Sequence, residues 1–352
     1  MGDLTDALSA VVRAASAART PLRIVGGDTK SFYGRKTAGK VLSVAEHRGI
    51  IAYDPTELVI TARAGTSLAE LEDLLARNKQ ILAFEPLIFG AGGTVGGAVA
   101  SGLAGARRPF GGAVRDSVLG VTVMDGQGRP LRLGGTVFKN VAGFDGFRLM
   151  AGALGCLGVL LDVSLRVAPR PAAEVGLVLE EPWSASKARL IALMRRPTPL
   201  SGAVHDGECL HLRLSGPPAG VAALACDLGG AIEPLSFWEA LRRRDMAVVS
   251  APRLWRLSIP MATDTSAIDA LEGTTTRDWA GAEIWLDSDV PAPKIRLAAS
   301  RAGGHATLFR GAVADEEVFE PLLPPLFALH QRLKRAFDPA GVFNPGRMYQ
   351  DL

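Results

Sequence analysis

The first quarter of the chain changes from a helical to an extended pattern of apolar positions. Apolar residues recur every three or four positions in 4–15, which predicts an amphipathic helix with Leu4, Leu8, Val11, Val12 and Ala15 on one stripe. Short apolar runs bounded by polar or glycine residues follow it. They predict buried strands at 22–25, 41–44, 50–53 and 58–61.

Further elements follow from capping and turn signals. Ser67 and Glu70 form a capping-box pattern before a helical stripe of leucines. The turn DGQG at 125–128 lies between apolar runs and predicts a hairpin, and another strand is expected at 158–167. A last helical stripe runs from Leu326 to Phe337. Because strands and helices do not alternate regularly, the pattern favours an α+β fold over a doubly wound sheet.

Length and charge narrow the class of protein. The 352 residues are enough for about two domains, and the proline pair at 169 and 171 marks the expected boundary. With 39 basic against 36 acidic residues, the chain lacks the charge excess typical of a nucleic-acid binder. Three cysteines without a C-x-x-C pair exclude a disulfide framework and an iron–sulfur cluster held by this chain alone.

The cysteine usage fits a reducing compartment. The first nine residues carry no basic stretch, so we expect no signal peptide and a cytoplasmic protein. Any membrane attachment would then run through partner proteins.

Glycine is the unusual component. Nineteen of the 40 glycines lie between Gly90 and Gly158, a fifth of the chain. Residues 86–106 are uncharged and long enough to cross a bilayer, but seven of these 21 are glycine, which weakens a helix. We therefore expect no membrane span. A backbone that approaches a ligand closely explains the cluster better.

Two glycine-rich loops are candidate ligand sites. Residues 26–31 (GGDTKS) follow a strand, so their N–H groups can surround an anion, although a plain tight turn explains them equally well. Residues 90–97 (GAGGTVGG) lack the dinucleotide-binding spacing because Val95 replaces a glycine. One interpretation is a wall poor in side chains that faces a ligand, with Thr94 as N-cap of a helix over 95–101. The other is a purely structural loop.

The histidines predict no metal site. His205 and His211 flank Glu208 and could be ligands on a hairpin, but they are better explained as exposed polar residues. His305 follows two glycines and precedes an apolar run, where a ring can be held in a pocket; a loop histidine satisfied by its neighbours is the alternative.

In their order along the chain, these segments resemble the FAD-linked oxidases of the vanillyl-alcohol-oxidase, or PCMH-type, family. The resemblance covers about half of the chain, from 22 to 171 and from 326 to 349. Within the family, the short middle region, GGHAT at 303–307 and the ending FNPGRMY at 343–349 look most like FAD-binding subunits of bacterial glycolate oxidases. The matching segments are 25–31, 92–97, 110–126, 139–145, 152–159 and 338–347.

The resemblance implies a PCMH-type FAD-binding domain over 1–171 and a small α+β cap over 172–322. A C-terminal helix and closing segment at 323–352 would return to the flavin domain. It implies oxidation of glycolate, a 2-hydroxy acid, to glyoxylate, with electrons passed to partners. Those partners would be a larger FAD-linked catalytic subunit and an iron–sulfur subunit. Asp28 and Thr29 stand where the family often has a flavin-linking histidine, so FAD should be bound non-covalently.

Carried over residue by residue, the resemblance and the loop chemistry give the expected site. The candidates for substrate chemistry are His305 as base and Arg310 or Arg347 for the carboxylate. The expected FAD contacts are Gly26, Gly27, Asp28, Thr29, Lys30, Ser31, Gly92, Gly93, Thr94, Val95, Gly96, Gly97, Ser101, Gly102, Lys139, Asn140, Asp145, Gly155, Gly158, Val159 and Asn344.

Two departures leave alternatives open. Ala153 and Leu154 stand where the family commonly has Ser-Glu, and 172–320 contains no cluster of histidines and acids. The chain could therefore be a non-catalytic subunit that keeps the flavin fold and stabilises its partner. It could also be a self-sufficient FAD-dependent oxidase of another 2-hydroxy acid or an alcohol.

Overall fold

A computed structural model describes residues 2–136, 145–243, 251–312 and 316–352. The chain forms two compact units. The first comprises Met1–Ala104, Ala113–Arg170 and Pro321–Leu352, and the second Gly105–Gly112 and Pro171–Glu320. Both mix helices and strands, which confirms the α+β prediction. Residues 105–112 cluster with the second unit, although the sequence pattern had included them in 1–171.

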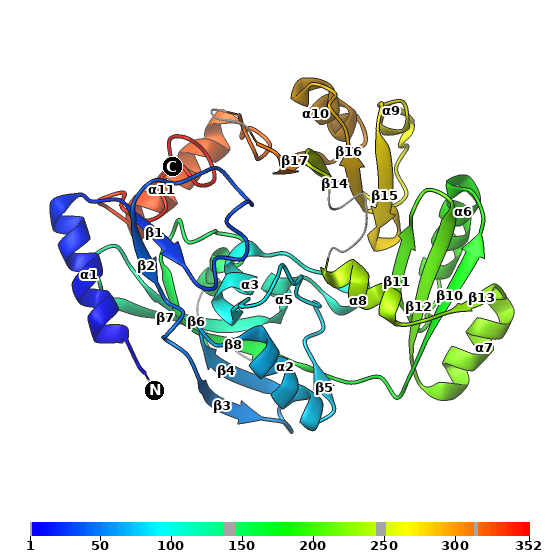
Figure 1. Cartoon of the computed structure of the whole chain (residues 1–352), viewed down its shortest axis with the longest axis horizontal. Helices are drawn as coiled ribbons and strands as arrows, with labels where there is room; N and C mark the ends of the chain where they lie inside the picture. The colour runs from blue at the N-terminus through cyan, green and yellow to red at the C-terminus, as the bar shows by residue number, and fades with distance from the viewer. Residues whose placement is uncertain (1, 137–144, 244–250, 313–315) are drawn as a thin grey trace. The chain divides into compact units, whose positions relative to one another are not determined.

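The first unit is built on a five-stranded antiparallel sheet in the order β3-β4-β8-β6-β7 (Figure 1). Leu68, Leu71 and Leu75 of α2 pack with the helix α3 into the core on this sheet. The bounds are β3 Ile50–Asp54, β4 Val59–Arg63, β6 Val118–Met124, β7 Pro130–Gly134, β8 Val159–Arg166, α2 Leu68–Arg77 and α3 Val95–Ser101.

A second layer of the same unit joins the two ends of the chain. β1 (Leu22–Val25) pairs in parallel with β2 (Lys40–Ser43), and Leu22 also bridges to Phe343. Figure 1 shows the C-terminal segment beside β1. The remaining elements are α1 Thr5–Ala18, β5 Gln80–Ile81, α5 Val114–Ser117, the 3-10 helix η1 Gly146–Met150, β9 Ala168–Pro169 and α11 Pro324–Phe337.

The second unit is built on an eight-stranded antiparallel sheet in the order β13-β10-β12-β11-β15-β16-β14-β17. Its strands are β10 Ala173–Glu180, β11 Leu200–His205, β12 Cys209–Gly216, β13 Ala231–Glu233, β14 Leu254–Ser258, β15 Thr274–Asp278, β16 Glu283–Asp287 and β17 His305–Arg310. Its helices are α4 Arg108–Gly111, α6 Trp183–Met194, α7 Pro218–Leu228, α8 Ser236–Arg243, α9 Ser266–Asp269, α10 Ala292–Arg301 and the 3-10 helix η3 Trp279–Gly281.

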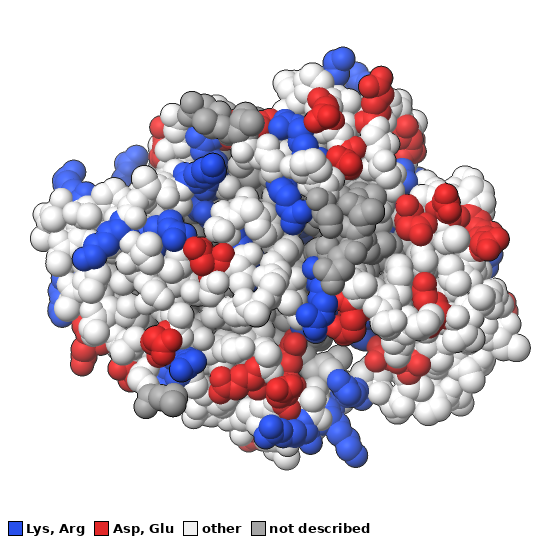
Figure 2. Space-filling view, in the orientation of Figure 1, with Lys and Arg blue, Asp and Glu red and all other residues white. Residues whose placement is uncertain are grey.

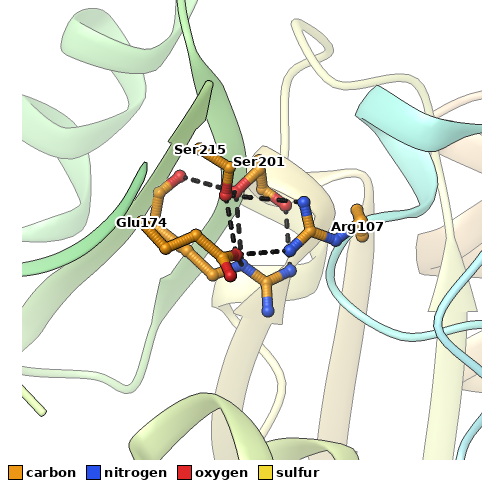
Figure 3. Close-up of polar contacts among 5 residues, drawn as sticks. Arg107, Glu174, Ser201 and Ser215 are labelled. Carbon is orange, nitrogen blue, oxygen red and sulfur yellow. Dashed lines mark hydrogen bonds and ion pairs between the residues drawn. The ribbon is translucent and has the colours of Figure 1, made fainter. Parts of the chain in front are cut away.

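Residues 105–112, which we call the strap, are anchored to this sheet by polar contacts. Arg107 donates to Glu174 of β10 at 2.6 Å, and Ser215 of β12 donates to the same carboxylate at 2.8 Å (Figure 3). Ser201 of β11 and Ser215 lie 2.5 Å apart in the same cluster. The Trp279 indole donates to the carbonyl of Gly105 at 2.9 Å. These bonds explain why the strap belongs to the second unit.

His205 and His211 are buried, so the expectation that they are exposed is wrong. The His211 ring lies 2.7 Å from Glu233 and 3.1 Å from Asp206, and it stacks on Phe237 with ring centroids 4.1 Å apart. Burial alone would lower the pKa of His211, but the two carboxylates outweigh it and hold the pKa above its ordinary value. Among the described residues, no group of three or more metal-ligating side chains is found.

The helices of the described ranges are all too short or too polar to cross a membrane. The uncharged run 86–106 contains only the seven-residue α3. On the face in Figure 2, basic and acidic side chains occur together, as the small net charge of +3 leads one to expect.

Candidate cofactor site

A pocket of about 920 Å³ in the first unit gathers segments from both ends of the chain. The glycine loop 26–31 after β1 forms one part of it, and α3 forms another. Residues 153–155 and the C-terminal residues Asn344 and Arg347 complete the lining.

The two glycine loops pack so closely that side chains are excluded between them. A Cβ at Gly26 would lie 2.5 Å from the Thr94 hydroxyl, and a Cβ at Gly27 would lie 1.6 Å from the carbonyl oxygen of Gly92. Asp28 adopts a φ of 53° and pairs with Arg23 at 2.9 Å. The glycines of the first loop are therefore required by the approach of the second.

The two glycine loops differ in how their backbone donors are used. Among the hydrogen bonds of the described residues, none is donated by a backbone N–H of 26–31. The N–H groups of Val95, Gly96 and Gly97 instead donate to Thr66 O, Ala64 O and the Thr94 hydroxyl. The expectation that 92–97 supplies N–H donors to an anion is thus wrong for these three residues, which hold α3 in place.

Lys30 brings a positive charge to the pocket. Burial lowers the pKa of its ammonium group to about 8, because the charged form loses hydration. The Nζ atom lies 5.7 Å from the centroid of the Phe89 ring. An anion beside Lys30 would restore the lost charge stabilisation, so the first loop has the donor set and the charge that a phosphate group requires.

Asn344 joins three segments of the pocket lining. Its Oδ1 accepts from the Ile24 N–H at 2.8 Å, and its Nδ2 donates to the Leu154 carbonyl at 2.7 Å. Its φ of 39° is one that asparagine adopts more readily than most residues. A Cβ at Gly155 would lie 2.7 Å from this Nδ2. The amide therefore fixes β1 against the 154–155 turn.

Arg347 holds the first loop and the residues after it through their backbone carbonyls. Its Nη2 donates to the carbonyls of Lys30 and Tyr33 at 3.1 and 2.6 Å. Its own carbonyl accepts from the Arg35 N–H at 2.9 Å. The arginine expected to hold a substrate carboxylate is thus bonded to backbone carbonyls of the residues 30–33.

Lys334 fixes the end of α11 to the same region and was missed by the sequence analysis. Its buried Nζ donates to Asp338 at 2.9 Å and to the carbonyls of Cys156 and Phe343 at 2.8 and 2.6 Å. Asp338 in turn accepts from the Phe343 N–H at 2.7 Å. The spacing of Lys334 and Asp338 on one helical face was the only available signal.

The structure brings together most of the expected cofactor residues. Those that line the pocket are Gly26, Gly27, Asp28, Thr29, Lys30, Ser31, Thr94, Gly96, Gly97, Ser101, Gly155, Gly158 and Asn344. Gly92, Gly93, Val95, Gly102, Asp145 and Val159 do not line it. Lys139 and Asn140 lie outside the described residues. The lining also includes residues that the sequence analysis missed, among them Arg23, Thr37, Ala64, Met150, Ala153 and Leu154.

The candidates for substrate chemistry do not form one cluster. His305 begins β17 and Arg310 ends it, so their Cα atoms are about 16 Å apart. Partial desolvation of the ring and the charge of Arg256 lower the pKa of His305, against an opposing effect of Glu320. His305 and Arg310 belong to the second unit, whereas Arg347 belongs to the first.

Comparison with known proteins identifies the family. Residues 3–134 match the family described as FAD binding domain, and residues 312–348 match the C-terminal domain of FAD linked oxidases. The glycolate oxidase subunit GlcE of Escherichia coli (strain K12) is 45% identical over 351 residues, which cover 99% of both chains.

Two further likenesses are more distant. A D-lactate dehydrogenase of Anaerostipes hadrus is 30% identical over 177 residues, covering 50% of this chain and 37% of that enzyme. A solved structure of alkyldihydroxyacetonephosphate synthase shares the fold, with a TM-score of 0.70 and 14% identity, covering 97% of this chain and 74% of the other.

FAD is the cofactor of this family, and the pocket suits it. Gly26 and Gly27 lie so close to the second glycine loop that no side chain fits between them. Beside Lys30, the loop 26–31 offers N–H groups that donate no hydrogen bond to another described residue. With the match to GlcE running the full length of both proteins, the chain belongs to the GlcE family of glycolate oxidase subunits, within the FAD-linked oxidases.

Proposed function

We propose that this chain is the FAD-binding subunit of a glycolate-oxidising complex that converts glycolate to glyoxylate and passes the electrons to partner subunits. The observation that carries the proposal is the 45% identity to a glycolate oxidase subunit over 99% of both chains. The pocket of the first unit supports it, since its donors and charge match a diphosphate.

Within the pocket, the first loop would hold the diphosphate through the N–H groups of 26–31 and through Lys30. Asn344 and Arg347 would keep that loop in position from the other end of the chain. No histidine is present in the loop, so we propose non-covalent binding. When bound, FAD supplies the hydride acceptor for the α-carbon of the 2-hydroxy acid.

On the substrate side, we propose that His305 accepts the hydroxyl proton. Its lowered pKa keeps the ring neutral at pH 7, which is the form that takes up a proton. Arg310 ends the same strand about 16 Å from His305, so we do not propose it as the partner of the same acid's carboxylate. Arg347 is better explained as a positioning residue for the first loop, because it already donates to two carbonyls there.

We further propose that the partners are a larger FAD-linked catalytic subunit and an iron–sulfur subunit. The three cysteines of this chain are free and differ in burial: Cys156 is buried, Cys209 half-buried and Cys226 exposed. They do not form a cluster site, so electrons that leave this flavin need an acceptor on another chain. We propose that the complex works in the cytoplasm and that any membrane attachment runs through these partners.

The visible spectrum of the purified chain tests the proposal. We expect flavin absorbance after gentle purification, and we expect glycolate to bleach it only when the partner subunits are added. Bleaching in the isolated chain would instead indicate a self-sufficient oxidase. A chain without flavin that still stabilises its partners would indicate a non-catalytic assembly subunit.

A further inference from the structure

The helix α11 leaves apolar side chains exposed on one face. Of its 14 residues only Lys334 is buried, whereas the ten-residue α2 buries Leu68, Leu71 and Leu75. Leu326 and Leu329 are 44% and 42% exposed. With Leu333 they share one face at helical spacing, and we call these three residues the leucine stripe.

The leucine stripe runs into a hollow of the first unit. This hollow, which we call the basin, has a volume of about 800 Å³, and its lining includes Leu333, His330, Leu149, Leu157 and Arg115. Six large apolar side chains are exposed among the described residues of the first unit. Four of them belong to this region: Leu149, Leu323, Leu326 and Leu329. Such a concentration is typical of an interaction surface.

The charged side chains exposed on α11 are all basic. The sequence of α11 contains no acidic residue, and Arg332 and Arg335 on it are exposed. At the basin the charges are mixed, because Arg115 pairs with Asp116 at 3.8 Å and Arg148 pairs with Asp116 and Asp145. An occupant that fits the α11 side of the surface therefore brings apolar side chains with carboxylates around them.

The basin and the cofactor pocket lie on two sides of one segment. Met150, Leu154 and Gly155 line the pocket, whereas Leu149, Ala151 and Cys156 line the basin. Ala153 lines both. A single layer of chain thus separates the two spaces, so an occupant of the basin would contact the wall of the cofactor site.

We propose that the leucine stripe and the basin form the docking surface for a partner subunit that presents apolar side chains bordered by carboxylates. This inference rests on the proposed function, which supplies the complex. A second copy of this chain fits less well, because a two-fold contact across α11 would bring Arg332 and Arg335 towards their own copies. Because the basin borders the wall of the cofactor pocket, a partner bound there should also change the flavin spectrum.

The test is the double variant Leu326→Gln/Leu329→Gln, which keeps good helix formers at both positions. Its matched control is Leu297→Gln on α10, where the leucine is 52% exposed. We expect the double variant to retain flavin like the wild type, but to bind purified partner subunits at least tenfold more weakly in biolayer interferometry. The control should bind like the wild type. Unchanged affinity of the double variant would overturn the inference.

Two further measurements separate the outcomes. Light scattering that shows a wild-type dimer and a monomeric double variant would assign the surface to a second copy and overturn the proposal. The variant Arg332→Glu/Arg335→Glu should slow association with the partner, and salt should reduce the difference. If the wild-type chain holds no flavin or joins no glycolate-oxidising complex, the proposed function itself fails. If the wild-type chain holds flavin and joins the complex, but the variants bind the partner normally, only the proposed docking surface is wrong.

Discussion

The side chain of Asn344 accepts a hydrogen bond from the backbone N–H of Ile24 at 2.8 Å, although 320 positions separate the two residues in the sequence. Through this bond and the one to Leu154, a single amide ties the strand before the first loop to the closing segment. The geometry of the cofactor pocket therefore depends on residues at both ends of the chain.

Replacing Asn344 by alanine should destabilise the first unit. The Ile24 N–H and the Leu154 carbonyl would each lose a partner, at a cost of about 2 to 3 kcal/mol together. We expect flavin to be released at a lower temperature in a fluorescence melt. Asn78→Ala, which removes a bond to Leu74 O at an exposed helix end, should change this temperature little. Equal effects of the two variants would contradict the role of Asn344.

FAD affinity should fall as the pH rises through about 8. The pKa of Lys30 is about 8 without an anion, and a bound phosphate would raise it, so binding takes up a proton above that pH. Titration of the flavin-free chain at pH 7 and 9 measures this. Lys30→Met should weaken binding at pH 7 by about tenfold and remove the pH dependence. The exposed Lys36→Met is the control, and a pH dependence that persists in Lys30→Met would refute the assignment.

Gly96→Ala should impair flavin retention, whereas Gly93→Ala should not. A Cβ at Gly96 would lie 2.7 Å from the Ala64 Cβ and 2.9 Å from the Ala64 carbonyl oxygen, so α3 must shift. At Gly93 the nearest atom, Leu68 Cδ1, is 3.4 Å away, an ordinary contact. The flavin-to-protein absorbance ratio after gel filtration reports the difference. Full retention in Gly96→Ala would show that the position of α3 is not critical.

The carboxylates of Glu233 and Asp206 beside His211 should make the second unit more stable at acidic than at basic pH. The pKa of His211 is raised in the folded state, so its contribution is fully present below the unfolded value of about 6.5. It is lost as the pH rises through the folded pKa. Calorimetry between pH 6 and 8.5 should show this loss in the wild type, and His211→Gln should remove that part of the pH dependence. A variant with the wild-type profile would contradict the prediction.

Arg107→Ala should loosen the strap from the second unit. The Arg107 side chain is 12% exposed and donates to Glu174 at 2.6 Å, so its loss should lower the free energy of unfolding by about 2 kcal/mol. Urea unfolding measures this. In Arg196→Ala, which removes an exposed ion pair with Asp227, the change should stay below about 1 kcal/mol. A result that ranks the two variants in the opposite order would count against the strap.

Local signals in the sequence led to the glycine loops and the Thr94 cap. Thr94 accepts from the Gly97 N–H at 3.1 Å, as its place before a helix predicts, and Ser67 accepts from Ala69 N. Such features depend on neighbours a few positions away, so spacing alone reveals them.

The contacts of Lys334 with Cys156 and of Arg347 with Lys30 join residues 178 and 317 positions apart. No periodicity or turn signal encodes them. The same holds for His211, which is buried against Glu233 of β13 and Phe237 of α8. Residues that depend on long-range partners were thus the ones that the sequence analysis missed or misjudged.

The placement of Asn344 and Arg347 has a consequence for the order of events during synthesis. The ribosome makes the loop 26–31 early, yet the residues that fix it emerge only after about 300 more, roughly 15 to 60 s later at 5–20 residues per second. The second unit, including its strap, ends at Glu320, so its own sequence is complete before the last residues of the pocket are made. We therefore expect FAD to bind only after translation, once Asn344 and Arg347 have packed against β1 and the first loop.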